Sequence, residues 1–200
     1  MKLTRVRRCI FMFKLVDVED VVRIPPEKFG KPLKEVAEEE LKSKYVGLVD
    51  SSLGYVIDVL NVKIDPVGKI IPGDGATYHR AVFTLLTFYP VLQEIVEGDV
   101  VDVQDFGAFV RLGPVDALLH MSQIMDDFIA YDRQREALVG RQTGRFLRKG
   151  DVVRVRIVAV SLPKTGGGIG KIGVTAKQPF LGKLEWIKEE VAKLHGGGEG

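Results

Sequence analysis

Hydrophobic residues recur with two different periods in the first half of the chain. Residues 13–24 are rich in valine and leucine and stop at Pro25 and Pro26, which predicts a long strand, because proline cannot donate to a ladder. Apolar residues then recur at helical spacing between Pro32 and Gly47. Further strands are expected at residues 55–64, 69–71 and 81–88. The pattern predicts an α+β domain in which one helix packs against an antiparallel sheet.

The second half has a different pattern, in which short apolar runs alternate with glycine turns. The runs cover residues 99–103, 108–112, 117–120, 152–160 and 171–175. Many short strands with glycine turns are typical of a small β-barrel. A charged insertion, residues 125–149, separates the third run from the fourth.

The end of the chain has the pattern of a helix. Leu184 and Ile187 share a face at helical spacing, which predicts a C-terminal helix over residues 181–195. Together with Trp186 they form more apolar surface than a free helix needs. We therefore expect Leu184, Trp186 and Ile187 to pack against the domain junction or a partner. The glycine-rich tail, residues 196–200, is expected to be disordered.

These patterns divide the chain into successive parts. The expected order is an α+β domain, an all-β barrel and a C-terminal helix. Their boundaries are residues 12–92 for the first domain, 93–180 for the barrel and 181–195 for the helix.

Composition excludes several classes of protein. With 46% hydrophobic and 28% charged residues, the chain has an ordinary globular composition. A single cysteine excludes a disulfide framework, and three histidines far apart in sequence make a histidine-rich metal site improbable. No apolar run reaches the length of a membrane span. We expect a cytoplasmic protein with no metal and no cofactor.

The net charge of +2 conceals a local basic stretch. Residues 133–156 contain eight basic and two acidic side chains. Such a stretch is typical of a surface that binds a polyanion, although a solvated surface can have the same composition. On charge alone, Arg141, Arg145 and Arg148 are candidate nucleic-acid ligands.

One continuous pattern in the second half suggests a more specific chemistry. It runs from Gly98 through Phe106 and Phe109 to His120 and Ser122. Two aromatic rings three residues apart across a bend can reach one outer face of a barrel, where they would stack on unpaired bases. Arg111 and His120 could add contacts to phosphates or bases. The spacing alone leaves open whether Phe106 and Phe109 belong to the core instead.

Three features of the sequence suggest enzymatic or metal chemistry but have the wrong context. The glycines at residues 168–173 match a dinucleotide fingerprint, but they precede a strand instead of following one. Asp126 and Asp127 are adjacent carboxylates, which we interpret as a loop cap and not as a magnesium site. Cys9 has no evident histidine partner. No catalytic residue is therefore predicted.

The segment from Gly98 to Ser122 resembles the S1-type RNA-binding domain, which is an OB-fold barrel. The closing strands also fit this resemblance, because Gly150 precedes the fourth strand and Gly173 lies in the fifth. Two residues depart from the family pattern. Ala117 replaces a common glycine, and Ser161 replaces a frequent acidic residue that contacts RNA.

Segments outside the barrel narrow the resemblance to the family of archaeal RNA polymerase stalk subunits called E-prime, whose eukaryotic counterpart is the seventh subunit of polymerase II. The resemblance covers residues 12–194. Residues 1–11 have no place in it, so we expect either that they form a basic N-terminal extension or that Met12 is the true start. The segments that carry it are residues 21–26, 73–79, 123–127 and 181–187, which read VVRIPP, GDGATYH, QIMDD and LGKLEWI.

This resemblance implies a structural subunit and not a catalyst. The first half would be a tip domain that docks on the polymerase core, with Gly73, Asp74 and Gly75 in the docking loop. The chain would form a heterodimer with the second stalk subunit of RNA polymerase, which is called F. Its barrel would bind nascent single-stranded RNA near the exit channel. The family also assists promoter opening together with transcription factor E.

Two other functions remain open at this point. One is a free-standing S1-type RNA-binding factor of translation or RNA decay, which would not need the loop at residues 73–75. The other is an RNA nuclease with an appended barrel, which would need an acidic or histidine constellation that the sequence does not contain.

Overall fold

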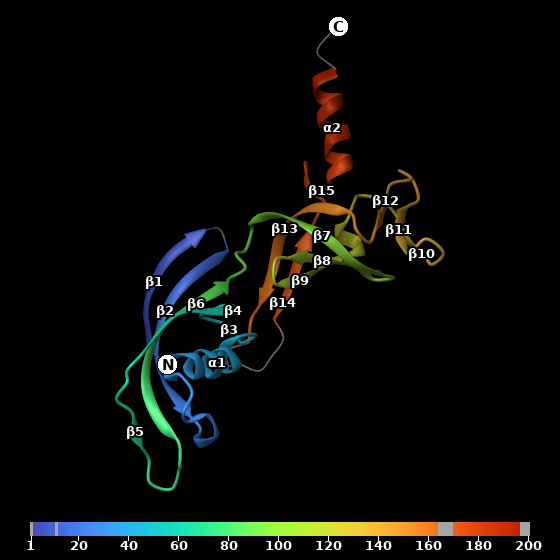
Figure 1. The fold of residues 1–200 in the computed structure, drawn as a ribbon. Coiled ribbons are helices and arrows are strands. Elements are labelled where there is room, and N and C mark those ends of the chain that lie inside the picture. The colour runs from blue at the N-terminus through green and yellow to red at the C-terminus, as the bar shows by residue number, and fades with distance from the viewer. Residues whose placement is uncertain (1, 11, 164–169, 197–200) are drawn as a thin grey trace. The chain divides into compact units, whose positions relative to one another are not determined.

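A computed structural model of the protein describes residues 2–10, 12–163 and 170–196. The described residues form two compact units, one built on residues 2–89 with residues 162–163, and the other on residues 90–161 and 170–196 (Figure 1). The first unit is a sheet with one helix, and the second is a barrel with an inserted sheet and a terminal helix. This is the fold class that the sequence predicts.

The first unit is an antiparallel sheet with the strand order β1-β2-β6-β4-β3, and β5 pairs with one end of β6. The long strands β2 and β6 pair along their whole length, from Phe13 opposite Phe88 to Ile24 opposite Thr77. The strands are β1 (Lys2–Ile10), β2 (Phe13–Ile24), β3 (Val49–Asp50), β4 (Gly54–Ile64), β5 (Lys69–Ile70) and β6 (Thr77–Phe88).

A single helix, α1 (Leu33–Tyr45), covers one face of this sheet (Figure 1). Val36, Ala37 and Leu41 are buried, and their helical spacing places them on the side that faces the sheet core. The short turn η1 (Pro26–Lys28) joins β2 to the helix. The three acidic residues at 38–40 lie on the less buried side of the helix, where Lys28 pairs with two of them.

Two features of the first unit differ from the expectation. The expected extension, residues 1–11, contains strand β1, which pairs antiparallel with β2 from Lys2 opposite Glu19 to Ile10 opposite Phe13. Strand β6 begins at Thr77 and not at residue 81. It is longer because residues 77–80 pair with the far end of β2, a partner distant in sequence.

The second unit is a closed barrel of five strands in the order β7-β8-β9-β14-β13, closed by pairing of β13 with β7. Strands β9 and β14 are parallel and the other pairs are antiparallel, as in an OB-fold. The barrel strands are β7 (Ile95–Gln104), β8 (Gly107–Leu112), β9 (Val115–His120), β13 (Val152–Ser161) and β14 (Lys171–Thr175), with the turn η2 (Met121–Gln123) after β9.

The charged insertion is a small antiparallel sheet of three strands, which the sequence pattern did not reveal. The strands are β10 (Ile129–Asp132), β11 (Ala137–Gly140) and β12 (Phe146–Arg148). Leu138 and Leu147 are fully buried beneath the sheet. Strands of three or four residues are too short to show an alternation, which is why charge dominated the interpretation of this segment.

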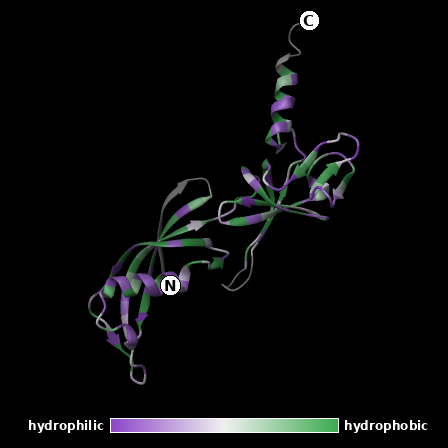
Figure 2. Cartoon of the chain, turned by 45° about the vertical axis from the view of Figure 1, so that its right-hand side comes forward, coloured by the Kyte–Doolittle hydropathy of each residue, from purple (hydrophilic) through white to green (hydrophobic). Residues whose placement is uncertain are grey.

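The C-terminal helix, α2 (Leu184–Gly196), begins three residues later than expected. Gly182 and Lys183 form the short strand β15, which pairs with Val153 and Arg154 of β13. The helix alternates polar and apolar residues along its length (Figure 2). Residues 197–200 of the expected disordered tail lie outside the described residues. No helix in the described part of the chain has the length and apolar character needed to cross a membrane.

Candidate nucleic-acid interface

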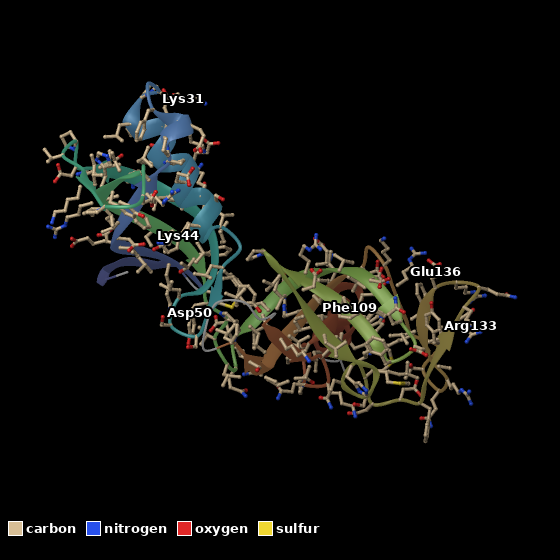
Figure 3. The ribbon with its side chains drawn as sticks, turned by 90° about the horizontal axis from the view of Figure 1, so that it is seen from below. Lys31, Lys44, Asp50, Phe109, Arg133 and Glu136 are labelled. Atoms are coloured by element: carbon tan, nitrogen blue, oxygen red, sulfur yellow. The ribbon has the colours of Figure 1, made fainter. Side chains whose placement is uncertain are left out.

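The alternation of β8 and β9 separates the barrel core from an outer face. Ala108 and Val110 are fully buried, whereas Phe109 is half-buried and Arg111 is exposed. Phe109 pairs with Leu118 across the strands, so their side chains share the outer face. Figure 3 labels Phe109 on the barrel. We call the outer surface of β8 and β9, with the turn before β8, the barrel face.

The two phenylalanines of the motif lie together on the barrel face. Phe106, in the turn between β7 and β8, is 43% exposed. Its ring centroid is 6.0 Å from that of Phe109, and the two planes meet at 87°. This edge-to-face contact fixes the rings relative to each other and leaves part of each surface open to solvent. Neither ring belongs to the barrel core.

His120 lies beside these rings at the end of β9. It is the cross-strand partner of Gly107, and the backbone N–H of Met121 donates to the carbonyl of Phe106 at 2.9 Å. Nδ1 of His120 accepts from the backbone N–H of Ser122 at 3.2 Å and lies 2.8 Å from its hydroxyl. Because a backbone N–H can only donate, Nδ1 is the acceptor, and the proton of a neutral ring is on Nε2. Nε2–H is then the ring donor available to a ligand.

Gly107 allows the close approach of β8 to β9. A Cβ atom at this position would lie 2.4 Å from the carbonyl oxygen of Leu119. No side chain fits this gap without separating the strands that carry Phe109 and His120. The glycine of the motif is therefore required by packing.

The charges on the barrel face are balanced and not strongly basic. Nε and Nη2 of Arg111 donate to the two carboxylate oxygens of Asp116 at 2.7 and 2.9 Å. This bidentate pair holds the pKa of the Asp116 carboxyl below its usual value and neutralises the arginine. Asp99 lies opposite Arg111 and Asp102 opposite Phe109 on the neighbouring strand β7. The main surface that this face presents to a ligand is therefore aromatic and not charged.

The three arginines predicted from charge alone have different environments. Arg145 lies over the ring of Trp186 at 5.5 Å, and its Nη1 donates to Glu190 at 3.2 Å. Arg148 is largely exposed, 3.9 Å from Asp151, and Arg141 is exposed. The structure therefore gives Arg145 a packing role and leaves Arg141 and Arg148 accessible. The sequence pattern did not indicate that Phe146 is an exposed aromatic residue beside Arg148. Its only signal in the sequence was its place between two arginines.

The loop with Gly73, Asp74 and Gly75 is held by its own aspartate. Nε and Nη2 of Arg23 donate to the Asp74 carboxylate at 2.9 and 2.8 Å, and the Tyr78 hydroxyl donates at 2.5 Å. These hydrogen bonds hold the pKa of Asp74 well below its usual value. Asp74 therefore shapes the loop, which leaves the backbone and the neighbouring apolar side chains for any docking contact.

The three apolar residues of the C-terminal helix that are expected to pack differ in how deeply they are buried. Trp186 and Ile187 are 7% and 6% exposed, and Leu184 is half-buried. A Cβ atom at Gly182 would lie 3.2 Å from the Trp186 ring, which shows how closely the ring packs on β15. Trp186 is thus buried within the second unit itself.

The carboxylates considered for a metal have protein partners. Asp127 accepts from the backbone N–H groups of Gln142 and Thr143 and so caps the turn between β11 and β12. Asp126 forms an ion pair with Lys177 at 2.7 Å. Within the described part of the chain, no group of three His, Cys, Asp or Glu side chains is arranged to hold a metal.

The other two features with possible enzymatic chemistry lie partly outside the described structure. These are the side chain of Cys9 and residues 168–169 of the dinucleotide-like motif. The end of that motif is the start of strand β14.

Two protein-family models match this chain, one in each unit. Residues 19–75 match the SHS2 domain found in the N terminus of Rpb7p/Rpc25p/MJ0397. Residues 89–166 match the S1 RNA binding domain.

Curated relatives match almost the whole chain. DNA-directed RNA polymerase subunit Rpo7 of Saccharolobus shibatae is 46% identical over 89% of this chain and 98% of its own length. The Rpo7 subunit of Sulfolobus acidocaldarius is 43% identical over 91% of this chain and 98% of its own length. DNA-directed RNA polymerase III subunit RPC8 of Bos taurus is 29% identical over 77% of this chain and 78% of its own length.

Proposed function

Because this chain belongs to the family of DNA-directed RNA polymerase subunit Rpo7, a stalk subunit of the polymerase, we propose that it binds nascent single-stranded RNA and pairs with the second stalk subunit, called F. It acts as a non-catalytic subunit, and it assists promoter opening, with transcription factor E as a further partner. The first unit docks on the polymerase core, and the second unit contacts the transcript near the exit channel.

The barrel face is the observation that carries the RNA-binding proposal. Phe106 and Phe109 lie side by side on an outer surface, and the Nε2–H group of His120 lies at the end of the same strand pair. Aromatic rings stack on any base, because every base has a π-face. A polymerase subunit that follows any transcript needs contacts of this kind, which do not read sequence.

The charges on the barrel face support weak, non-selective binding. Arg111 is already neutralised by Asp116, so this surface gains little from phosphate contacts. Stacking contributes about 1–3 kcal/mol per base. We expect an RNA complex that depends on the two phenylalanines and discriminates poorly between sequences.

Substitution of Phe109 tests this proposal. Phe109→Ala should weaken binding of a labelled single-stranded RNA about 5-fold to 150-fold, which corresponds to the loss of one stacked base. Fluorescence anisotropy with the full chain measures the change. Phe29→Ala removes an exposed aromatic ring from the first unit and serves as the matched control. If a folded Phe109→Ala variant binds RNA as the wild type does, the stacking role of the barrel face is wrong.

The pairing with the second stalk subunit has a separate test. Light scattering after size-exclusion chromatography of the mixed proteins should show a complex with one copy of each. If the two proteins elute separately at micromolar concentration, the proposed heterodimer is wrong, whatever the RNA result.

The family membership bears on the alternative functions. The first half matches a domain described for the N terminus of polymerase subunits, and a free-standing S1 factor would not need this domain. The two Rpo7 relatives are matched over 98% of their length, so the likeness is not confined to the barrel.

A further inference from the structure

The insertion sheet has an outer surface with the features of a second binding site. Val139 pairs with Ala130 on one side and with Phe146 on the other, and Ala137 pairs with Arg148. Cross-strand partners share a face, whereas the intervening Leu138 and Leu147 are fully buried on the opposite side. We call the surface formed by Ala130, Val139, Phe146 and Arg148, together with Ala137, which is buried at its floor, the insertion face.

This face has an apolar floor and a rim of arginines. A hollow of about 410 Å³ lies over Ala137, Val139 and Phe146, with Arg135 and Arg148 at its edges. A second, more open hollow adjoins it and shares Arg135 and Val139. Its other rim residues include Arg133 and Arg141. Figure 3 shows Arg133 and Glu136 in the turn between β10 and β11.

The arginines of this rim are held loosely. Arg148 is 3.9 Å from Asp151, and Arg135 is 3.7 Å from Asp132, with side chains that are 64% and 79% exposed. Charge-assisted hydrogen bonds are about 2.7–2.9 Å long, as in the pair formed by Arg111 on the barrel face. Among described residues, Arg141 has no ion-pair partner. These guanidinium groups can therefore move to a ligand without breaking a strong contact.

Phe146 presents a ring on the same face. It is 43% exposed, and the guanidinium of Arg148 lies 5.6 Å from the ring centroid. Lys183, which is 5% exposed, lies 4.7 Å from the centroid and borders the neighbouring hollow beside Trp186, not the insertion-face hollow. The ring is thus in contact with Lys183 of β15 and remains partly exposed beside the guanidinium of Arg148.

We propose that the insertion face is a second contact for single-stranded RNA, in which Phe146 stacks on a base and Arg135, Arg141 and Arg148 bind the flanking phosphates. The inference takes the identity of the ligand from the proposed function, but it rests on a different surface. An aromatic ring beside exposed, weakly paired arginines suits a nucleotide, whereas an acidic peptide would use the charges and leave the ring unused. The barrel face supplies stacking, and the insertion face supplies most of the phosphate contacts.

Two sets of substitutions separate stacking from charge at this face. Arg135→Gln combined with Arg148→Gln should weaken binding of a labelled single-stranded RNA about 10- to 30-fold near 0.1 M salt. It should also lower the slope of log affinity against log salt by about 1.4, because each phosphate contact contributes about 0.7. Phe146→Leu keeps an apolar side chain and should weaken binding about fivefold or more without changing the salt slope.

Matched controls and a competitor complete the experiment. Arg80→Gln combined with Arg154→Gln removes two arginines outside the insertion and should change affinity less than twofold. Phe109→Ala is measured in parallel on the full chain, and polyglutamate is the competing acidic peptide. The expected result is that polyglutamate competes poorly with RNA, because it cannot use Phe146.

Each other outcome overturns a defined statement. If the insertion variants bind RNA as the wild type does while Phe109→Ala binds weakly, the inference is wrong and the proposed function stands. If the arginine variant loses RNA but Phe146→Leu does not, and polyglutamate competes well, the face is a general basic surface for an acidic partner and the inference is wrong. If the wild-type chain does not bind RNA, the proposed function itself is wrong.

Discussion

Individual carboxylates fix several of the contacts on which this fold depends. Asp20 on β2 accepts from Nζ of Lys44 at 2.6 Å and from the hydroxyl of Tyr45 at 2.5 Å, and so ties the end of α1 to the sheet. Burial alone would raise the pKa of Asp20, but these hydrogen bonds lower it well below its usual value. Asp74 and Asp127 hold loops in a similar way.

Asp20→Asn should destabilise the first unit at neutral pH by about 1–2 kcal/mol, a figure reduced for the solvent exposure of Lys44. Because the folded-state pKa of Asp20 is lowered, its contribution is complete above pH ~4 and is lost as the pH falls through the folded-state pKa. The difference between variant and wild type should therefore shrink in acid. Urea unfolding followed by circular dichroism at several pH values measures it.

Trp186 provides the control for this measurement. It is the one tryptophan of the chain and lies in the second unit. Its fluorescence transition should not move in Asp20→Asn. A difference that grows on acidification would contradict the assigned hydrogen bonds.

At the scale of elements, Arg145 connects the insertion to α2. Arg145→Ala removes the cation that covers Trp186 and leaves Glu190 without its nearest partner. We expect a red shift of tryptophan emission and a loss of about 1–2 kcal/mol from the stability of the second unit, because a partly buried cation–π contact and an ion pair are lost together. RNA affinity should change little. A large loss of RNA binding in a variant with unchanged emission would show that Arg145 contacts RNA instead.

The pairing of β8 with β9 depends on the absence of a side chain at Gly107. Gly107→Ala places a Cβ atom against the backbone of Leu119, which cannot move without separating the strands. The expected loss is about 2–4 kcal/mol from the stability of the second unit. Gly173→Ala is the matched control, because its Cβ meets only the Ala159 methyl group at 3.3 Å. Thermal unfolding followed by Trp186 fluorescence compares the two, and equal stability would contradict the close approach.

Elements with a long apolar pattern could be predicted from the sequence, and those defined by distant partners could not. Strand β2 and helix α1 have long apolar patterns and follow the prediction. The first residues of β6 and the short strand β15 exist because of pairing with β2 and β13, which no local pattern encodes. The strands of the insertion are too short for a period, so their outer face was unrecognisable among the charges.

The same limit applies to the candidate site. The sequence indicated Phe106, Phe109 and His120 because the strands that carry them are adjacent in the chain. It could not separate Arg145 from Arg148, since what distinguishes them is contact with Trp186 and Glu190 some 40 residues later. Charge in a sequence shows where cations are, and only the fold shows which of them have carboxylate partners.

At the scale of the whole molecule, two units of different construction serve two proposed tasks. The first unit is an α+β sheet with a loop held by Arg23 and Asp74, and it is the part proposed to dock on the polymerase core. The second unit combines an aromatic barrel face with an arginine-rimmed insertion face. Because each unit is compact by itself, variants in one should leave the function of the other intact.

Photo-crosslinking of RNA to the full chain tests the central claim most directly. A single-stranded RNA that contains 4-thiouridine is irradiated with the chain bound to the second stalk subunit, and the crosslinked peptides are identified by mass spectrometry. We expect crosslinks within residues 106–120 on the barrel face and within residues 130–148 on the insertion face. Crosslinks confined to residues 12–89, or none at all, would contradict the assignment of RNA binding to the second unit.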